Sequence, residues 1–82
     1  MQSFFAVKNE TSFPVISVFI DEKRIFSDIL KGEMSKYAPI EYGSAVLCVY
    51  NNFEKLILDK WISIAPNKRL VLSIYDGDLK FT

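Results

Sequence analysis

The sequence predicts an all-β protein, an antiparallel two-sheet sandwich of seven or eight short strands. Short apolar or alternating runs recur at spacings of roughly 8–12 residues, and a turn cluster ends each run, which is the rhythm of a β-sandwich. No stretch has the helical hydrophobic period of about 3.6 residues. A chain of 82 residues supports one hydrophobic core, so we expect residues 1–82 to form a single domain. A small closed barrel is the alternative architecture.

The first strands are predicted by short apolar runs. Residues 4–8 form a short strand candidate. Residues 15–20 are almost continuously apolar and rich in β-branched side chains, which predicts a central strand. The charged tip 21–24 contains neither Gly nor Asn, so we expect a type I turn with a slightly longer loop before the next strand, which begins at Ile25.

The middle of the chain is less regular. Residues 27–32 are the least strand-like, and a single helical turn fits this stretch. A short edge strand is expected over residues 33–40, because Pro39 cannot donate a hydrogen bond to a β-ladder and belongs at an edge or a strand end. Gly43 is the expected position of positive φ in the next turn.

The C-terminal half contains the longest run. Residues 45–50 predict a second central strand, and residues 55–64 form a longer one. Lys60 shares the parity of the apolar side chains in that run, and a buried lysine is costly. We therefore expect either a bulge near Asp59 and Lys60 or a lysine that reaches solvent from a sheet edge.

The last strands are predicted by alternation and turn chemistry. Residues 69–75 alternate along the chain, as a strand with one buried face does. Asp76-Gly77 is the strongest hairpin signal in the sequence, so residues 78–81 are expected to return as a final short strand.

The charge balance argues against a nucleic acid partner. Ten Lys and Arg residues cancel ten Asp and Glu residues, so the chain lacks the positive field that draws proteins to phosphate backbones. Histidine is absent and Cys48 is the only cysteine, so the commonest metal ligands and an internal disulfide are missing. We expect no nucleic acid partner, no metal site and no cofactor.

The sequence offers few groups for catalysis. Acid catalysis near neutral pH needs a desolvated carboxyl group with a raised pKa. The carboxylate pairs lie on predicted hairpin tips that are open to water: Asp21 with Glu22, and Asp76 with Asp78. Cys48 has no histidine to activate it. We therefore expect no catalytic residues and a protein that is not an enzyme.

Nothing in the sequence predicts a membrane span or export. No apolar stretch approaches the roughly 18–20 residues of a spanning helix. Residues 1–5 lack the basic start and the long apolar stretch of a secretion signal. As given, the chain is expected to be soluble and cytoplasmic, without membrane insertion.

An outward row of apolar residues predicts a contact surface. If side chains simply alternate, four of them face away from the core on two neighbouring strands: Ile57, Trp61, Val71 and Tyr75. An exposed apolar patch is often an interaction site. Two alternatives stay open, namely a bulge that turns Trp61 inward and a C-terminal segment 79–81 that covers it.

This patch suggests two functions. In the first, the domain is a non-catalytic structural or protein-interaction module that joins a homo-oligomer or a larger assembly through the patch or an exposed strand edge. In the second, it binds carbohydrate by stacking Trp61, Tyr75 or Tyr42 against a sugar ring. The first is favoured, because carbohydrate platforms need several coplanar aromatic side chains beside polar ones, whereas the neighbours here are mainly aliphatic.

Several short segments resemble a bacterial protein family of unknown function. Residues 16–23, ISVFIDEK, resemble its V-D-V-Y-V-D-G-K signature, from which Ser17 and Glu22 depart. The other matching residues are Gly32, Glu33, Ser35, Tyr37, Gly43, Leu58, Ile62, Ile64, Pro66 and the strand from Arg69. Members are single or tandem immunoglobulin-like modules of cell-envelope and secreted proteins. The resemblance implies an immunoglobulin- or transthyretin-like sandwich, mostly outside the cytoplasm, and no particular activity.

Overall fold

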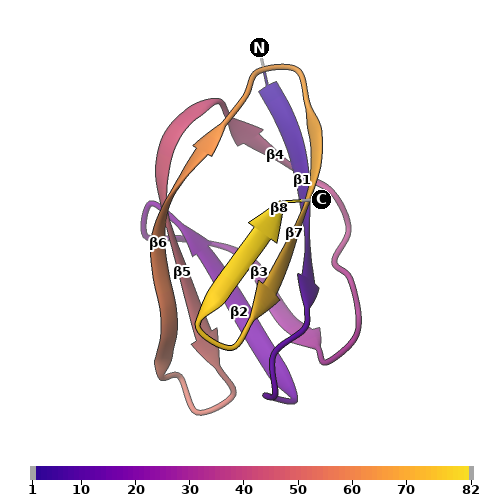
Figure 1. Ribbon diagram of the computed structural model, residues 1–82, viewed down its shortest axis with the longest axis vertical. Helices are drawn as coiled ribbons and strands as arrows, with labels where there is room; N and C mark the ends of the chain where they lie inside the picture. Colours follow the sequence, from indigo (N-terminus) through magenta and orange to yellow (C-terminus); the bar gives the residue numbers. More distant parts are fainter. Residues whose placement is uncertain (1, 82) are drawn as a thin grey trace.

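The computed structural model describes residues 2–81, which form two four-stranded sheets that enclose one core (Figure 1). The strands are β1 (Gln2–Asn9), β2 (Val15–Ile20), β3 (Lys23–Leu30), β4 (Ala38–Glu41), β5 (Gly43–Asn51), β6 (Leu56–Ile64), β7 (Arg69–Tyr75) and β8 (Asp78–Phe81). One sheet has the order β4-β1-β7-β8 and the other β3-β2-β5-β6. The predicted all-β, two-sheet sandwich is confirmed.

All strand pairings within residues 2–81 are antiparallel except one. β1 pairs in parallel with β7, with residues 4–9 opposite residues 69–74. Parallel partners cannot be joined by a hairpin, so this pairing joins strands that are distant in the sequence. It places the N-terminal strand between β4 and the C-terminal strand β7, inside its sheet.

The core fills the space between the two sheets. Every second side chain of β2 and β5 is buried, because successive side chains of a strand point to opposite faces. Phe5 of one sheet and Phe26 of the other pack with their ring centroids 5.1 Å apart. The buried apolar side chains of this cluster are Phe5, Val7, Ile16, Val18, Ile20, Ile29, Ile40, Ala45, Leu47, Val49, Leu58, Ile62, Ile64, Leu72 and Ile74.

The β2–β3 turn is tighter than predicted. Asp21 and Glu22 both have positive φ, 48° and 70°, and they form a two-residue connection in place of the expected longer loop. Asp21 is held by Val46, since the Asp21 N–H donates to Val46 O at 2.9 Å and the Asp21 carboxylate accepts from the Val46 N–H at 2.9 Å. These hydrogen bonds offset the cost of left-handed backbone at a residue with a side chain.

The middle of the chain is irregular, because β3 pairs with β2 through register shifts and residues 31–37 link β3 to β4 outside any strand. The helical turn predicted within residues 27–32 is absent, because β3 continues to Leu30 with register shifts against β2 and a φ of 55° at Asp28. The strand predicted over residues 33–40 is confined to β4, at the sheet edge expected for Pro39. Gly43 has the expected positive φ, 114°.

Lys60 lies on an edge strand. β6 is the last strand of its sheet, and Lys60 stands opposite the buried Leu47 of β5. Its ammonium group reaches solvent and bonds to Asp78 of β8 at 3.0 Å. Of the two predicted alternatives for Lys60, the structure has the lysine that reaches solvent from a sheet edge.

Candidate functional site: an aromatic sheet face

The four residues of the predicted patch do not share one surface. β6 carries Ile57 and Trp61 in one sheet, and β7 carries Val71 and Tyr75 in the other (Figure 1). The prediction that these strands are neighbours is wrong. Alternation fixes the face of a side chain within its strand, but it does not fix which strands pair.

Trp61 faces outward as predicted, whereas Ile57 does not. Trp61 is 74% exposed, so neither a bulge nor residues 79–81 cover it. Ile57 is partly buried and packs against the core. The cause is a bulge: Leu56 and Leu58 stand opposite adjacent residues of β5, which leaves Ile57 as the extra residue.

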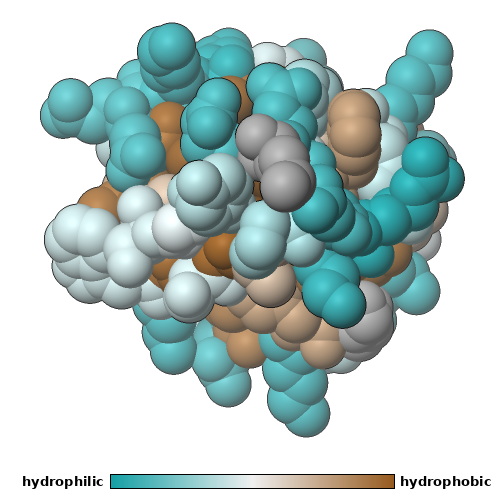
Figure 2. Space-filling view, turned by 90° about the horizontal axis from the view of Figure 1, so that it is seen from above, coloured by the Kyte–Doolittle hydropathy of each residue, from teal (hydrophilic) through white to brown (hydrophobic). Residues whose placement is uncertain are grey.

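Val71 and Tyr75 lie on the outer face of the β4-β1-β7-β8 sheet. Val71 is half-buried and Tyr75 is 37% exposed. By register, this face also carries the charged residues Lys8, Arg69, Asp78 and Lys80. In the end-on view, hydrophilic side chains protrude around hydrophobic ones that lie deeper between them (Figure 2). By the strand register, the outer face around Val71 combines apolar and charged side chains.

Trp61 belongs to an apolar band across the outer face of the β3-β2-β5-β6 sheet. It stands opposite Val46 of β5, and Cys48 of β5 stands opposite Phe19 of β2. Residues that stand opposite one another in a sheet project to the same side. We call this band the aromatic face and define it by five residues: Phe19, Val46, Cys48, Tyr50 and Trp61.

Ring contacts order the β2 end of the aromatic face. The rings of Phe19 and Tyr50 meet edge to face, with centroids 5.1 Å apart and planes at 68°. The Arg24 guanidinium lies over the Phe19 ring, with Cζ 5.2 Å from the centroid. These contacts hold three side chains together, whereas Trp61 extends into solvent at the other end of the face.

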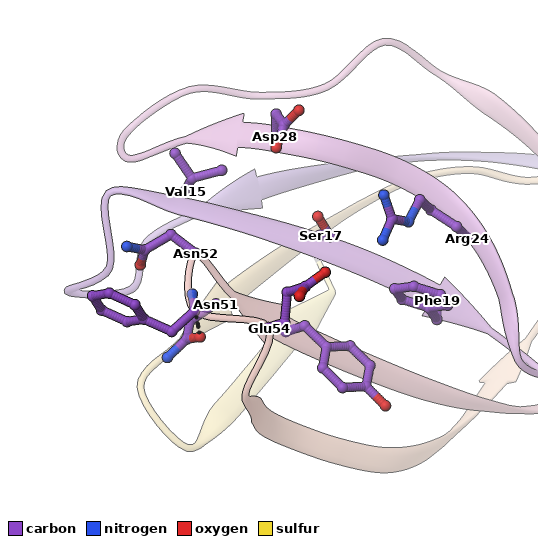
Figure 3. A pocket seen from close by; sticks show the side chains of 10 residues that line it. Val15, Ser17, Phe19, Arg24, Asp28, Asn51, Asn52 and Glu54 are labelled. Atoms are coloured by element: carbon purple, nitrogen blue, oxygen red, sulfur yellow. Dashed lines mark hydrogen bonds between the residues drawn. The ribbon is translucent and has the colours of Figure 1, made fainter.

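An open hollow of about 520 Å³ continues the aromatic face toward the β5–β6 turn (Figure 3). β2 and β3 form one part of its lining, and the end of β5 with the β5–β6 turn forms the rest. Asn51 shapes this turn, because its Oδ1 accepts hydrogen bonds from the N–H groups of Phe53 at 2.9 Å and Lys55 at 3.0 Å. Phe53 is thereby held in solvent at 80% exposure. The lining residues are Val15, Ser17, Phe19, Arg24, Asp28, Tyr50, Asn51, Asn52, Phe53 and Glu54.

Three charged side chains line this hollow. Neither of the ion pairs found in residues 2–81 involves Arg24, Asp28 or Glu54. Arg24 comes from β3 and Glu54 from the β5–β6 turn, so the two side chains reach the hollow from opposite sides of β2 (Figure 3). Asp28 and Glu54 have positive φ, 55° and 59°, which is uncommon for residues other than glycine. The hollow can offer one cation and two anions to a polar ligand.

The aspartates that could serve in catalysis are engaged by the main chain, and the cysteine has a raised pKa. Asp21, Asp76 and Asp78 each accept a hydrogen bond from a backbone N–H. Burial, with nearby carboxylates, raises the pKa of the Cys48 thiol, which disfavours the reactive thiolate. In the described part of the chain, no cluster of three or more His, Cys, Asp and Glu side chains could hold a metal ion. No helix there is long and apolar enough to cross a membrane.

Sequence reasoning found one end of the aromatic face and missed the other. It placed Trp61 outward, but it did not join Trp61 to Phe19 or Tyr50. The available signal was the alternation of β5, which puts Val46 and Tyr50 on the same side as Cys48. To join these β5 residues to Trp61, one also needs the β5–β6 register, which places Trp61 opposite Val46.

No protein-family model matches the chain, and the comparisons with curated proteins and with solved structures give no match. The resemblance of residues 16–23 to the V-D-V-Y-V-D-G-K signature therefore stays a prediction.

Proposed function

We propose that this protein is a non-catalytic protein-interaction module that binds a partner protein through the aromatic face. The observation that carries this proposal is the 74% exposure of Trp61 beside half-buried apolar neighbours. A partner that covers this side chain removes a large apolar area from water. Tryptophan is also among the residues whose loss most weakens protein interfaces.

Two further points support a role in contact rather than in chemistry. The carboxylate pairs that could serve in acid–base catalysis are exposed, and Asp21 and Asp76 accept hydrogen bonds from backbone N–H groups. The Cys48 thiol has a raised pKa. The resemblance to immunoglobulin-like modules supports the finer classification of this sandwich as immunoglobulin- or transthyretin-like. That resemblance implies no activity that competes with binding.

A positive charge at the centre of the aromatic face should abolish binding. Val46 is half-buried on an inner strand, so in Val46→Lys the ammonium can reach solvent without disturbing the core. Val71→Lys is the matched control, because Val71 is also half-buried on an inner strand but lies on the other sheet. Affinity capture from the native source should recover the same proteins with the wild type and Val71→Lys, and lose them with Val46→Lys. Equal recovery by all three would contradict the proposal.

Carbohydrate binding is the second candidate, and the hollow favours it. Phe19, Tyr50 and Phe53 line it beside polar side chains, which is the combination that sugar sites use. Trp61 is the only tryptophan, and the hollow does not include it, so a ligand there should be detected through Tyr50. In an NMR titration with soluble glycans, the Tyr50 ring signals should shift while those of Tyr42 stay fixed. Unchanged Tyr50 signals across a broad glycan panel would exclude this candidate.

A further inference from the structure

β6 is the long, regular edge strand among the four edges in residues 2–81 (Figure 1). β4 and β8 have four residues each, and β4 contains Pro39. β3 is interrupted by register shifts. β6 has nine residues, and its pairing with β5 is regular from Leu58 to Ile64. Short, bulged or proline-containing edges resist further pairing, whereas a long regular edge can accept another strand.

The hydrogen-bonding groups at this edge follow from the β5–β6 ladder. Val46 exchanges hydrogen bonds with Asp21, so its main-chain groups face β2. Trp61, which stands opposite Val46, therefore occupies a non-hydrogen-bonded pair, and its own N–H and C=O point to the open edge. By alternation, the main-chain groups of Asp59 and Ser63 point the same way. These three residues are the ones that a new strand would bond.

We propose that this edge binds a second copy of the chain, with the two β6 strands antiparallel and Trp61 opposite Trp61 of the second copy. Trp61 is the middle residue of the regular segment, residues 58–64. A two-fold axis there brings each edge-facing residue opposite another, with Asp59 opposite Ser63 of the second copy. The two four-stranded sheets then continue as one, and the two exposed indoles lie side by side.

Avoidance of like-charge repulsion favours this register. Lys60 lies opposite Ile62 of the second copy, and Leu58 lies opposite Ile64, so no like charges face each other. A slide by two residues in one direction would instead place Lys60 opposite Lys60 of the second copy, where like charges repel. A slide in the other direction shortens the paired segment and separates the indoles. An inward-pointing lysine on an edge strand limits pairing with other strands in general, and in this register Lys60 meets no facing charge.

The first test is the oligomeric state of the full chain. Sedimentation from about 1 μM to about 1 mM, the range of weak complexes, should show a monomer–dimer equilibrium. Trp61→Lys sets two ammonium groups together at the two-fold axis and should weaken the dimer by about 30-fold or more, as the loss of a hot-spot tryptophan does. Leu30→Lys is the matched control on the edge strand at the other side of the same sheet, and it should dimerise like the wild type. A wild type that stays monomeric over this range would overturn the proposal.

The second test reads the register while Trp61 stays in place. In a Cys48→Ser background, the pair Asp59→Cys and Ser63→Cys should form disulfides between two chains, because opposite residues in such a pair have Cα atoms about 5.5 Å apart. The same two residues of one chain lie about 13 Å apart along the strand, too far for a disulfide. Either cysteine alone should stay uncross-linked. A wild-type dimer whose double-cysteine variant does not cross-link would also overturn the proposal.

This inference rests on the proposed function, since Trp61 belongs to the aromatic face, but the two can fail separately. If the wild type is monomeric and capture depends on Val46, the face binds a different protein and the β6 dimer is wrong. If the cross-linked dimer forms and Val46→Lys captures the same proteins as the wild type, the β6 dimer stands and the proposed role of the face is wrong.

Discussion

The sandwich has two sides along which the edges of its sheets face each other, and these sides are held together in different ways. We call the side along which the β3–β4 link runs the closed side, and the side of β6 and β8 the open side. On one side, β3 of one sheet lies near β1 of the other, and the link between β3 and β4 runs along β1. Main-chain hydrogen bonds attach this link, among them Gly32 N–H to Asn9 O at 2.7 Å and Ser35 N–H to Val7 O at 2.8 Å. On the other side, the edges of β6 and β8 are joined by the ion pair of Lys60 with Asp78, and both side chains are exposed to solvent.

Asn9 is the centre of the closed side. Its side chain is fully buried, and its Nδ2 donates to Ile29 O in the other sheet at 3.0 Å and to Phe13 O at 3.3 Å. Its Oδ1 accepts from the N–H and the hydroxyl of Thr11, at 3.0 and 2.6 Å. One side chain thus connects β1 to the opposite sheet and fixes the loop that leads to β2.

The two sides therefore differ in how much their contacts stabilise the fold and in whether they leave a strand edge free to bind a partner. Buried hydrogen bonds are costly to break, because the groups left behind stay without water. Exposed ion pairs contribute little, because water and salt screen them. The closed side therefore stabilises the sandwich, whereas the open side presents a strand edge and Trp61 to a partner.

The largest effect should come from breaking the closed side at Asn9. Asn9→Ala leaves Ile29 O and the Thr11 N–H buried without their partner, and we expect a loss of about 2–4 kcal/mol in the free energy of unfolding. Asn52→Ala, at an exposed asparagine of the β5–β6 turn, should change that free energy by less than about 0.5 kcal/mol. Urea unfolding followed by circular dichroism measures both. Similar losses in the two variants would mean that Asn9 does not hold the closed side.

Local chemistry made most of the strands predictable. The apolar run of residues 15–20, the alternation of residues 69–75 and the Asp76-Gly77 turn locate β2, β7 and β8 correctly, because each signal lies within a few neighbouring residues. The Asp21–Glu22 turn was missed for the opposite reason. Its left-handed backbone is held by Val46, which is 25 residues away from Asp21, and no local propensity contains that contact.

The site was only half predictable because it depends on strand pairing. The position of Trp61 in its strand was enough to place it outward. Its partner Val46, and Phe19 farther across the same face, follow from the order β2-β5-β6, and this order is set by non-local contacts. The same absence of pairing information led to the grouping of Trp61 with Tyr75, which lies in the other sheet. Ile57 was misplaced by a bulge that leaves no clear mark in the sequence.

The smallest change in the free energy of unfolding should come from replacing Asp78 on the open side. This change should depend on pH. The hydrogen bond from the Leu79 N–H lowers the pKa of Asp78, and the neighbouring Lys60 ammonium lowers it further. A carboxyl whose pKa is lower in the folded state stabilises the fold above its unfolded pKa, near 3.8, and this contribution is lost as the pH falls through the folded pKa. Asp78→Asn should therefore be slightly less stable than the wild type at neutral pH, and the difference should vanish in acid.

The variant Lys60→Gln separates the two causes of the lowered Asp78 pKa, namely the Leu79 N–H and the Lys60 ammonium. The Leu79 N–H is the larger cause, so urea unfolding of Lys60→Gln should keep most of the pH dependence that Asp78 gives the wild type. Added salt should weaken the wild type toward Lys60→Gln, because the ion pair is exposed. If Lys60→Gln instead removes the whole pH dependence, the ion pair between the sheets is stronger than its exposure implies. The open side would then be closed by charge, and the contrast with the Asn9 side would be one of degree.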